Sequence, residues 1–156
     1  MKATQLTAFD ASFLALDTNI SVGHVTLLSL LDREVSPNEL FHQLEAHLHL
    51  APMLRRKLRA PSLVVGRPWW VDDPDFDLDQ HLRFVDLGGQ ADEAAMCAEA
   101  VRFSRQHLDR SRPLWELLLI GGLADGTGAM VSKIHHCAVD GVGKRDLLSL
   151  LFGTES

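Results

Sequence analysis

The sequence predicts an α/β fold, a two-layer sandwich in which a mixed, mainly antiparallel sheet carries its helices on one face. The first observation is a set of apolar, strand-like runs at residues 22–31, 114–123 and 129–136. The second is helical periodicity over residues 36–50 and 91–108. The third is the length of 156 residues, which suits one ordinary domain, so we expect a single domain.

The first strand and the segment before it differ in how clearly they are defined. Residues 22–31 are rich in leucine and β-branched side chains that partly alternate, which is typical of a strand. His24 within this run is expected to be a core or edge histidine rather than a catalytic one. The preceding residues 6–16 mix apolar side chains with an aspartate and fit either a short helix or an extended arm.

The first helix has a clear beginning. Ser36 can cap it, Pro37 suits the first helical position, and Glu39 completes a capping box. A core-facing stripe then recurs every four residues at Leu40, Leu44 and Leu48.

Basic side chains gather directly after this helix, at Arg55, Arg56 and Lys57. Runs of like charge are usually solvated, so a solvent-facing surface is the first interpretation. The alternative is contact with phosphate groups or with an anionic lipid surface.

Three short strands are expected in the middle of the chain, at residues 63–65, 69–71 and 82–85. The last two flank residues 72–79, where alternating aspartates resemble a calcium loop. Such a loop also needs a glycine and a terminal glutamate, which are absent here. We therefore expect an acidic surface turn.

A second helix over residues 91–108 leads into a β-hairpin. Residues 114–123 form a nearly continuous apolar run, which is typical of a strand buried on both faces. An Asp-Gly pair at 125–126 is a hairpin turn signal, so residues 129–136 should return antiparallel beside the first strand of the hairpin. This arrangement brings His136 to the end of a central strand.

The run from His135 to Gly141 joins that strand to a final helix expected over residues 141–152. Successive side chains of a strand point to opposite faces, so His135 and His136 should have different surroundings. Asp140 follows across a turn in which Gly141 gives backbone freedom, so its carboxylate can fold back toward the imidazole. Histidine is the natural general base for a hydroxyl or thiol, with an effect of about 10²- to 10⁴-fold on the rate.

The residues alone leave other interpretations of this run open. Structural hydrogen bonding is the default for two adjacent histidines. A metal site made of His135, His136 and Asp140 would imitate a two-histidine, one-carboxylate triad, but the opposite facing of neighbours disfavours it. A thiol nucleophile at Cys137 is disfavoured because neighbours in extended backbone rarely reach each other's reactive atoms. We expect no metal ligand here.

Composition and charge argue against several classes of protein. The net charge of −6 disfavours a nucleic-acid-binding protein. The two cysteines, Cys97 and Cys137, lack metal-ligand spacing, so a reducing, cytosolic setting is the simplest inference. No apolar run approaches the roughly 18 residues of a membrane span. We therefore expect a cytoplasmic protein.

The run His135 to Gly141 fits the pattern HHxxxDG, and in it the chain resembles the chloramphenicol-acetyltransferase-like, CoA-dependent acyltransferases, which include the condensation domains of peptide synthetases. More closely, the chain resembles the bacterial wax ester synthase/diacylglycerol acyltransferase family. The supporting pieces are weak singly, but they follow in order over nearly the whole chain. They are Leu6 to Leu16, Gly23-His24-Val25, Pro52 to Leu58, Trp70-Val71-Asp72, Phe76-Asp77-Leu78, His81, and Leu108 to Glu116.

This resemblance implies transfer of an acyl group from a long-chain acyl-CoA to the hydroxyl of a fatty alcohol or diacylglycerol. The product would be a wax ester or triacylglycerol, formed with no cofactor and no acyl-enzyme. His136 would be the general base, with His135 beside it in the catalytic motif. Asp140 and Gly141 would hold the loop and the orientation of the histidine.

The resemblance also assigns residues outside the motif. Pro113, Leu114 and Trp115 match a piece that shapes the acyl or alcohol channel, although Trp115 fits an ordinary core aromatic equally well. With CoA among the substrates, the alternative interpretation of the basic residues Arg55, Arg56 and Lys57, beside a solvated surface, becomes contact with the phosphates of CoA or with an anionic lipid.

Chains of this family continue into a second half of similar fold, with the substrate tunnel between the halves. The resemblance therefore implies that residues 1–156 are the N-terminal half, carrying the motif, with the C-terminal half absent. The implied partners are acyl-CoA, a lipid alcohol, and either a second-half chain or a second copy. Peripheral contact with the inner membrane or with lipid inclusions is a further option. The alternatives are an inactive acyl-chain- or lipid-binding module and an assembly subunit.

Overall fold

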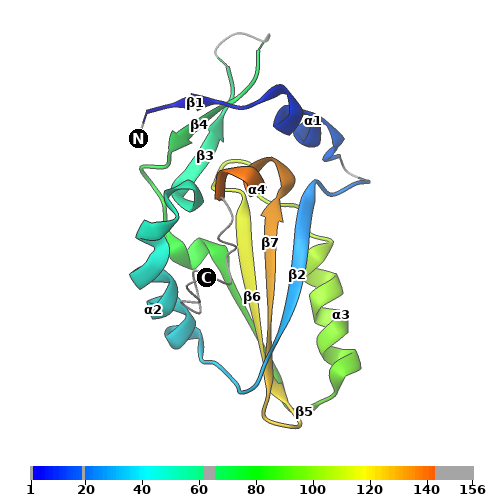
Figure 1. Ribbon diagram of the computed structural model, residues 1–156. Coiled ribbons are helices and arrows are strands. Elements are labelled where there is room, and N and C mark those ends of the chain that lie inside the picture. Colours follow the sequence, from blue (N-terminus) through cyan, green and yellow to red (C-terminus); the bar gives the residue numbers. More distant parts are fainter. Residues whose placement is uncertain (1, 19, 62–65, 143–156) are drawn as a thin grey trace.

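The structure, a computed structural model, describes residues 2–18, 20–61 and 66–142, with the backbone alone for residues 140–142. None of the helices in these ranges is long and apolar enough to cross a membrane. The elements follow the chain as in Figure 1. They are β1 (Thr4–Gln5), α1 (Ala8–Leu16), β2 (His24–Leu31), α2 (Pro37–His47), β3 (Arg56–Arg59), β4 (Trp69–Asp72), β5 (Leu82–Ala91), α3 (Glu93–Ser104), β6 (Trp115–Leu123), β7 (Gly128–His135) and α4 (His136–Val142), with short 3₁₀ helices at Leu48–Leu50, Pro52–Arg55 and Leu78–His81.

Four strands form the central sheet in the order β2-β7-β6-β5. Strand β7 lies antiparallel to both β2 and β6, whereas β5 lies parallel to β6. The α/β class and the mixed, mainly antiparallel sheet are therefore confirmed. The predicted β6–β7 hairpin is present, and it turns at Gly126, whose φ of 74° lies in the left-handed region.

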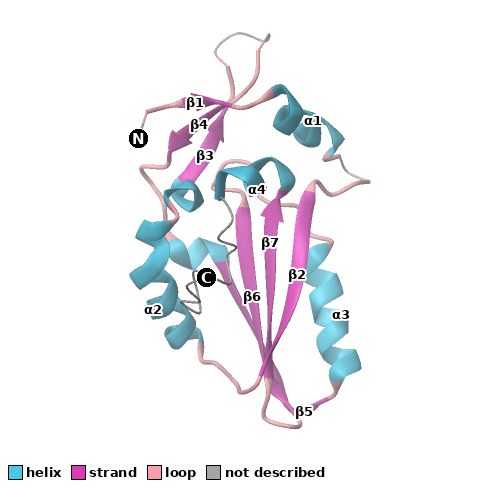
Figure 2. Cartoon of the chain, in the orientation of Figure 1, coloured by secondary structure: helices cyan, strands magenta, loops and turns pink. Residues whose placement is uncertain are grey.

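A second, three-stranded sheet has the order β1-β4-β3. Figure 2 shows it beyond the end of the central sheet that carries α4. The predicted strand at residues 69–71 is present as β4, but its partners are β1 and β3 rather than the central sheet. The prediction of a single sheet is therefore incomplete, and the predicted strand at residues 63–65 lies outside the described residues.

The helices cover both faces of the central sheet, which corrects the prediction of helices on one face. Helix α2 shares a buried apolar cluster with Leu117 and Leu119 of β6. Helix α3 shares a different cluster with Leu118 and Ile120 of the same strand. Because alternate residues of a strand point to opposite faces, β6 is apolar on both sides and each side needs its own cover.

The two long helices differ in how well their ends agree with the prediction. Helix α2 begins as predicted, where Ser36 Oγ accepts a hydrogen bond from the Glu39 N–H (3.1 Å). Helix α3 is capped by Asp92 but ends at Ser104, four residues earlier than predicted. The segment 105–113 that follows is therefore a loop, and it delivers side chains to the site described next.

Candidate active site

The two histidines of the motif lie where β7 ends and α4 begins, at the end of a central strand (Figure 1). The side chain of His135 is buried and that of His136 is exposed, so the two neighbours differ in surroundings as the strand alternation predicts. The His136 N–H donates to Gly23 O (2.8 Å), which ties the junction to the beginning of β2. The final helix begins at His136 and not near Gly141, so the predicted turn between the pair and the helix is wrong.

His135 is a buried and neutral side chain. Its Nδ1 accepts a hydrogen bond from the Cys137 N–H (3.2 Å), so the ring proton belongs on Nε2. Nε2 faces Asp17 Oδ2 at 3.5 Å without a regular hydrogen bond. Burial outweighs the attraction of the Asp17 carboxylate and lowers the pKa of His135 to about 4. His135 thus links Asp17 to the first turn of α4.

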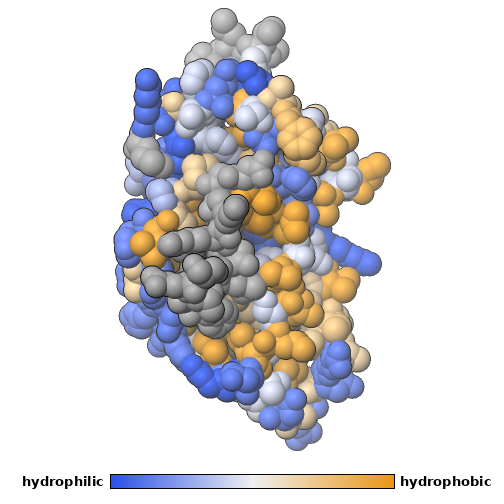
Figure 3. All heavy atoms as spheres, in the orientation of Figure 1, coloured by the Kyte–Doolittle hydropathy of each residue, from blue (hydrophilic) through white to orange (hydrophobic). Residues whose placement is uncertain are grey.

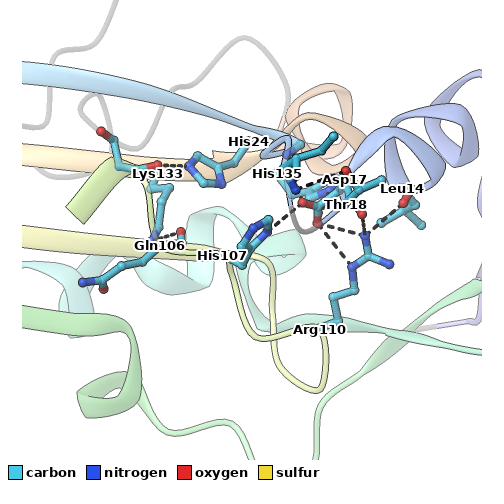
Figure 4. Close-up of polar contacts among 12 residues, drawn as sticks. Leu14, Asp17, Thr18, His24, Gln106, His107, Arg110, Lys133 and His135 are labelled. Atoms are coloured by element: carbon cyan, nitrogen blue, oxygen red, sulfur yellow. Dashed lines mark hydrogen bonds and ion pairs between the residues drawn. The ribbon is translucent and has the colours of Figure 1, made fainter. Parts of the chain in front are cut away.

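Asp17 lies directly after α1, at the centre of the polar groups beside His135 (Figure 4). Its carboxylate accepts hydrogen bonds from Arg110 Nη2 (2.9 Å), His107 Nδ1 (2.9 Å) and the Gly23 N–H (3.2 Å). Burial acts to raise the pKa of this carboxyl, but the hydrogen bonds from Arg110, His107 and Gly23 outweigh it and lower the pKa. Asp17 therefore stays charged and joins three separate segments of the chain.

Asp17, His107 and Arg110 are site residues that the sequence pattern does not predict. His107 and Arg110 lie 90 and 93 positions from Asp17, in a loop without regular periodicity. The available signal is indirect, because Arg110 and Gly23 belong to two of the segments that carry the family resemblance.

Gly23 is required by the close approach of Asp17 and His135. A Cβ at this position would lie 2.6 Å from His135 Nε2 and 2.7 Å from the Asp17 Cβ. Both distances are shorter than a normal van der Waals contact, so a larger residue would force the cluster apart.

His136 presents its imidazole outside the core. The ring lies face to face with the ring of Phe13 in α1, with 3.7 Å between the centroids and 15° between the planes. Within the part of the chain that the structure describes, no hydrogen bond reaches either ring nitrogen of His136. In the neutral imidazole one of these nitrogens carries no proton, and none of the described residues occupies it, so it is a candidate to accept the proton of a hydroxyl group.

Asp140 and Gly141 lie in α4, about one turn after His136. The side chain of Asp140 is outside the described residues. The return of its carboxylate toward the imidazole therefore stays a prediction.

The geometry favours neither a metal site nor a thiol nucleophile. His135 faces Asp17 whereas His136 lies on Phe13, so the two imidazoles do not converge. Among the described side chains, no group of three or more His, Cys, Asp or Glu could hold a metal ion. Burial raises the pKa of the Cys137 thiol to about 12, so this thiol stays protonated.

The predicted channel residues Pro113, Leu114 and Trp115 are buried. Trp115 stacks on the ring of His81 (4.4 Å between centroids), and its Nε1–H donates to a backbone carbonyl (2.7 Å). Leu114 O accepts a hydrogen bond from the His135 N–H (2.9 Å). Trp115 is therefore a core aromatic, and Leu114, directly before β6, supports the motif through its backbone carbonyl. A channel role for this segment stays a prediction.

The three residues of the predicted anion contact have separate surroundings. Arg56 is buried, and its guanidinium donates to the backbone carbonyls of residues 2 (2.9 Å) and 70 (2.7 Å). The predicted anion contact is therefore wrong for Arg56, because its guanidinium is buried and donates to backbone carbonyls. Lys57 Nζ pairs with Asp73 Oδ1 (2.6 Å), and Arg55 lies over the ring of Phe76 (5.3 Å). An anion contact by Lys57 and Arg55 stays a prediction.

Two open hollows lie away from the exposed histidine. One, of about 520 Å³, lies beside the Asp17 cluster and is lined by His24, Ser104, Arg105 and His107 among others. The other, of about 410 Å³, lies between α2 and β5 and is lined by Phe41, Leu82, Phe84 and Leu119 among others. Neither is lined by His136, so these hollows alone do not hold a substrate against it.

Comparisons with known proteins give a consistent result. The profile of the family described as "Wax ester synthase/diacylglycerol acyltransferase catalytic domain" matches residues 6–155. A putative diacylglycerol O-acyltransferase of Mycobacterium tuberculosis is 34% identical over 153 residues, which are 95% of this chain and 32% of the relative. The probable diacylglycerol O-acyltransferase tgs1 of the same organism is 34% identical over 148 residues, 92% of this chain and 32% of the relative. The chain thus spans about a third of the length of these relatives.

Solved structures agree with this result. The wax ester synthase/diacylglycerol acyltransferase of Marinobacter aquaeolei VT8 has a TM-score of 0.70 and 33% identity, over 89% of this chain and 36% of that chain. A mutant starter condensation domain of rhizomide synthetase RzmA, solved in complex with C8-CoA, has a TM-score of 0.66 and 17% identity, over 90% of this chain and 35% of that chain. The second likeness shows a shared fold alone.

Proposed function

The chain belongs to the wax ester synthase/diacylglycerol acyltransferase family, and from this premise we propose that it transfers an acyl group from a long-chain acyl-CoA to a lipid alcohol. The acceptor would be a fatty alcohol or diacylglycerol, and the product a wax ester or triacylglycerol. The observation that carries the proposal is the exposed imidazole of His136, which has no hydrogen bond to its nitrogens from the described residues.

In the proposed reaction His136 accepts the proton of the alcohol hydroxyl. The alcohol oxygen attacks the carbonyl carbon of the thioester, and the carbon–sulfur bond breaks as the ester bond forms. The proton then passes from the imidazolium of His136 to the sulfur of the departing CoA thiolate. The steps balance without a metal or cofactor, so we expect none.

His135 has a supporting role in this proposal. Its Nδ1 is occupied by the Cys137 N–H and its Nε2 faces Asp17, so neither nitrogen is directed to a substrate. Since His136 follows His135 directly, fixing the first turn of α4 also limits where the second imidazole can lie.

A direct test supplies the chain with palmitoyl-CoA and either hexadecanol or dioleoylglycerol, and measures ester formation by mass spectrometry. The proposal expects an ester with at least one acceptor and its loss in His136→Ala. As a matched control, His49→Ala removes an exposed histidine outside the motif, and ester formation should persist. The relatives are about three times as long, so the test is also made with a relative's remaining polypeptide added as a separate chain.

A second candidate, an assembly subunit, is favoured by the exposed edge of the central sheet. Strand β2 has β7 on one side and, among the described residues, no strand on the other. It contains no charged residue, and four of its apolar side chains are exposed: Val25 (46%), Leu27 (47%), Leu28 (38%) and Leu30 (70%). Figure 3 shows apolar atoms gathered over β2 and α1. Edges and patches of this kind are typical of interaction surfaces.

A further inference from the structure

Helix α1 brings an aromatic ring against the His136 imidazole. The centroids of Phe13 and His136 lie 3.7 Å apart and their planes differ by 15°, so one face of the imidazole is covered by the phenyl ring. Phe9, one turn earlier, meets Phe13 edge-on, with 5.1 Å between the centroids. The phenyl ring therefore contacts both Phe9 and the His136 imidazole.

Both ends of α1 are fixed, which fixes the phenyl ring in turn. Thr7 caps the first turn by accepting a hydrogen bond from the Asp10 N–H (3.0 Å). At the other end, Arg110 Nη2 donates to Leu14 O and to Asp17 O, both at 2.9 Å. Arg110 thus binds the carbonyls that the helix leaves free at its C-terminal end, as well as the Asp17 carboxylate.

We propose that Phe13 is a positioning residue for His136, an inference that rests on the proposed role of His136 as the general base. Stacking restricts rotation of the imidazole about its bond to Cβ, and this rotation decides where the ring nitrogens point. The face of the phenyl ring also attracts the imidazolium that forms when His136 takes the proton. A leucine in place of Phe13 keeps an apolar side chain but provides neither effect.

The first experiment observes the contact itself through the ring C–H signals of histidine in NMR spectra. The chain has eight histidines, and comparison with His136→Gln identifies the signals of His136. Because the phenyl ring covers the imidazole, these signals should be shifted upfield relative to those of the exposed His49. The shift should be lost in Phe13→Leu and kept in Phe13→Tyr. Unshifted His136 signals in the unmodified chain, or signals unaffected by Phe13→Leu, would overturn the proposal.

The second experiment separates positioning from general stability by steady-state kinetics of acyl transfer. Misplacement of a reacting group costs on the order of a hundredfold, so kcat of Phe13→Leu should fall about ten- to a hundredfold. The KM for acyl-CoA should change by less than about twofold, since Phe13 acts on the histidine and not on substrate binding. The Phe13→Tyr variant should keep a kcat close to that of the unmodified chain. Leu16 is an exposed residue of the same helix, and Leu16→Ala should leave kcat unchanged.

The outcomes distinguish this inference from the function on which it rests. If His136→Ala stops turnover and Phe13→Leu does not, the role of Phe13 is wrong and the proposed base stands. If both variants keep full turnover, the role of His136 as the general base is contradicted, and if the chain has no turnover, the proposed function is contradicted. The NMR signals of His136 then decide whether Phe13 holds the imidazole.

Discussion

Burial keeps the His135 imidazole neutral at pH 7 and makes the stability of the fold depend on pH. Its pKa is about 4 in the folded chain, below the value of about 6.5 expected in the unfolded chain. The unfolded chain therefore binds the proton first as pH falls. This stability is complete above pH 6.5 and is lost between pH 6.5 and pH 4.

Urea unfolding at pH 7 and pH 4.5 tests this for the unmodified chain and for the His135→Asn variant. Asparagine is chosen because its side-chain oxygen can still accept a hydrogen bond from the Cys137 N–H. The unmodified chain should lose about 2–3 kcal/mol of unfolding free energy through His135 over this interval. The loss in His135→Asn should be smaller by that amount. Parallel losses in the two proteins would show that His135 is not buried as described.

Asp17 also favours its deprotonated form in the folded chain, but that form is the charged one. Because its pKa is lowered in the folded chain, its contribution is present above about pH 3.9 and is lost as pH falls through the folded pKa. At pH 7, Asp17→Asn should lower the unfolding free energy by about 1–3 kcal/mol, since Arg110 loses its charged partner. The difference from the unmodified chain should narrow at pH 3. Asp75→Asn, at an exposed position in the acidic turn, serves as the control, and an equal effect there would contradict the assignment.

The local pattern predicts part of this residue-level picture. Strand alternation is enough to place His135 and His136 in different surroundings. It does not predict the roles of Asp17, His107 and Arg110, because these positions lie far apart in the sequence and meet only in the folded chain. The stack of Phe13 on His136 was missed for the same reason.

At the level of elements, the beginning of β2 must pass very close to the end of β7. Gly23→Ala would place a Cβ 2.6 Å from His135 Nε2, so we predict a loss of about 1–3 kcal/mol in unfolding free energy from overpacking. Gly121→Ala is the matched control. Its Cβ would meet the end of the flexible Glu34 side chain, which can move aside. Thermal unfolding checks both variants, and an unchanged midpoint for Gly23→Ala would contradict the close approach.

The early end of α3 shows why element boundaries escape local patterns. Lys133, buried in β7, donates to Phe103 O (3.3 Å) and Gln106 O (2.9 Å) at this helix end and pairs with Glu116 (3.0 Å). A lysine from a strand thus binds carbonyls at the end of a helix that lies about thirty positions earlier in the chain. The helical pattern itself continues to residue 108, so the sequence carries no local sign of this contact. Similarly, the apolar run of β6 predicts burial on both faces but not which helix covers each face.

At the scale of the whole molecule, the exposed edge of β2 predicts association. At high concentration, light scattering should show species heavier than the 17.3 kDa monomer, because an uncharged, apolar edge strand readily pairs with another strand. Leu30→Lys adds a charge at the most exposed of its leucines and should restore the monomer. A strictly monomeric unmodified chain would count against the assembly candidate, and Val101→Lys on α3 controls for the added charge.

The family and the fold class could be predicted from the sequence, because the chain keeps the family's short motifs in order although it is only about one third identical to its relatives. The surroundings of the motif could not be predicted, because they form only when α1 and the 105–113 loop come together at one end of the sheet. The chain also spans only about a third of its relatives' length.

The most direct test of the central claim is the initial rate of CoA release from palmitoyl-CoA in the presence of a lipid alcohol. The proposal predicts alcohol-dependent release that falls by at least about a hundredfold in His136→Ala and is unchanged in His49→Ala. Equal rates for the unmodified chain and His136→Ala would contradict the role of His136 as the general base.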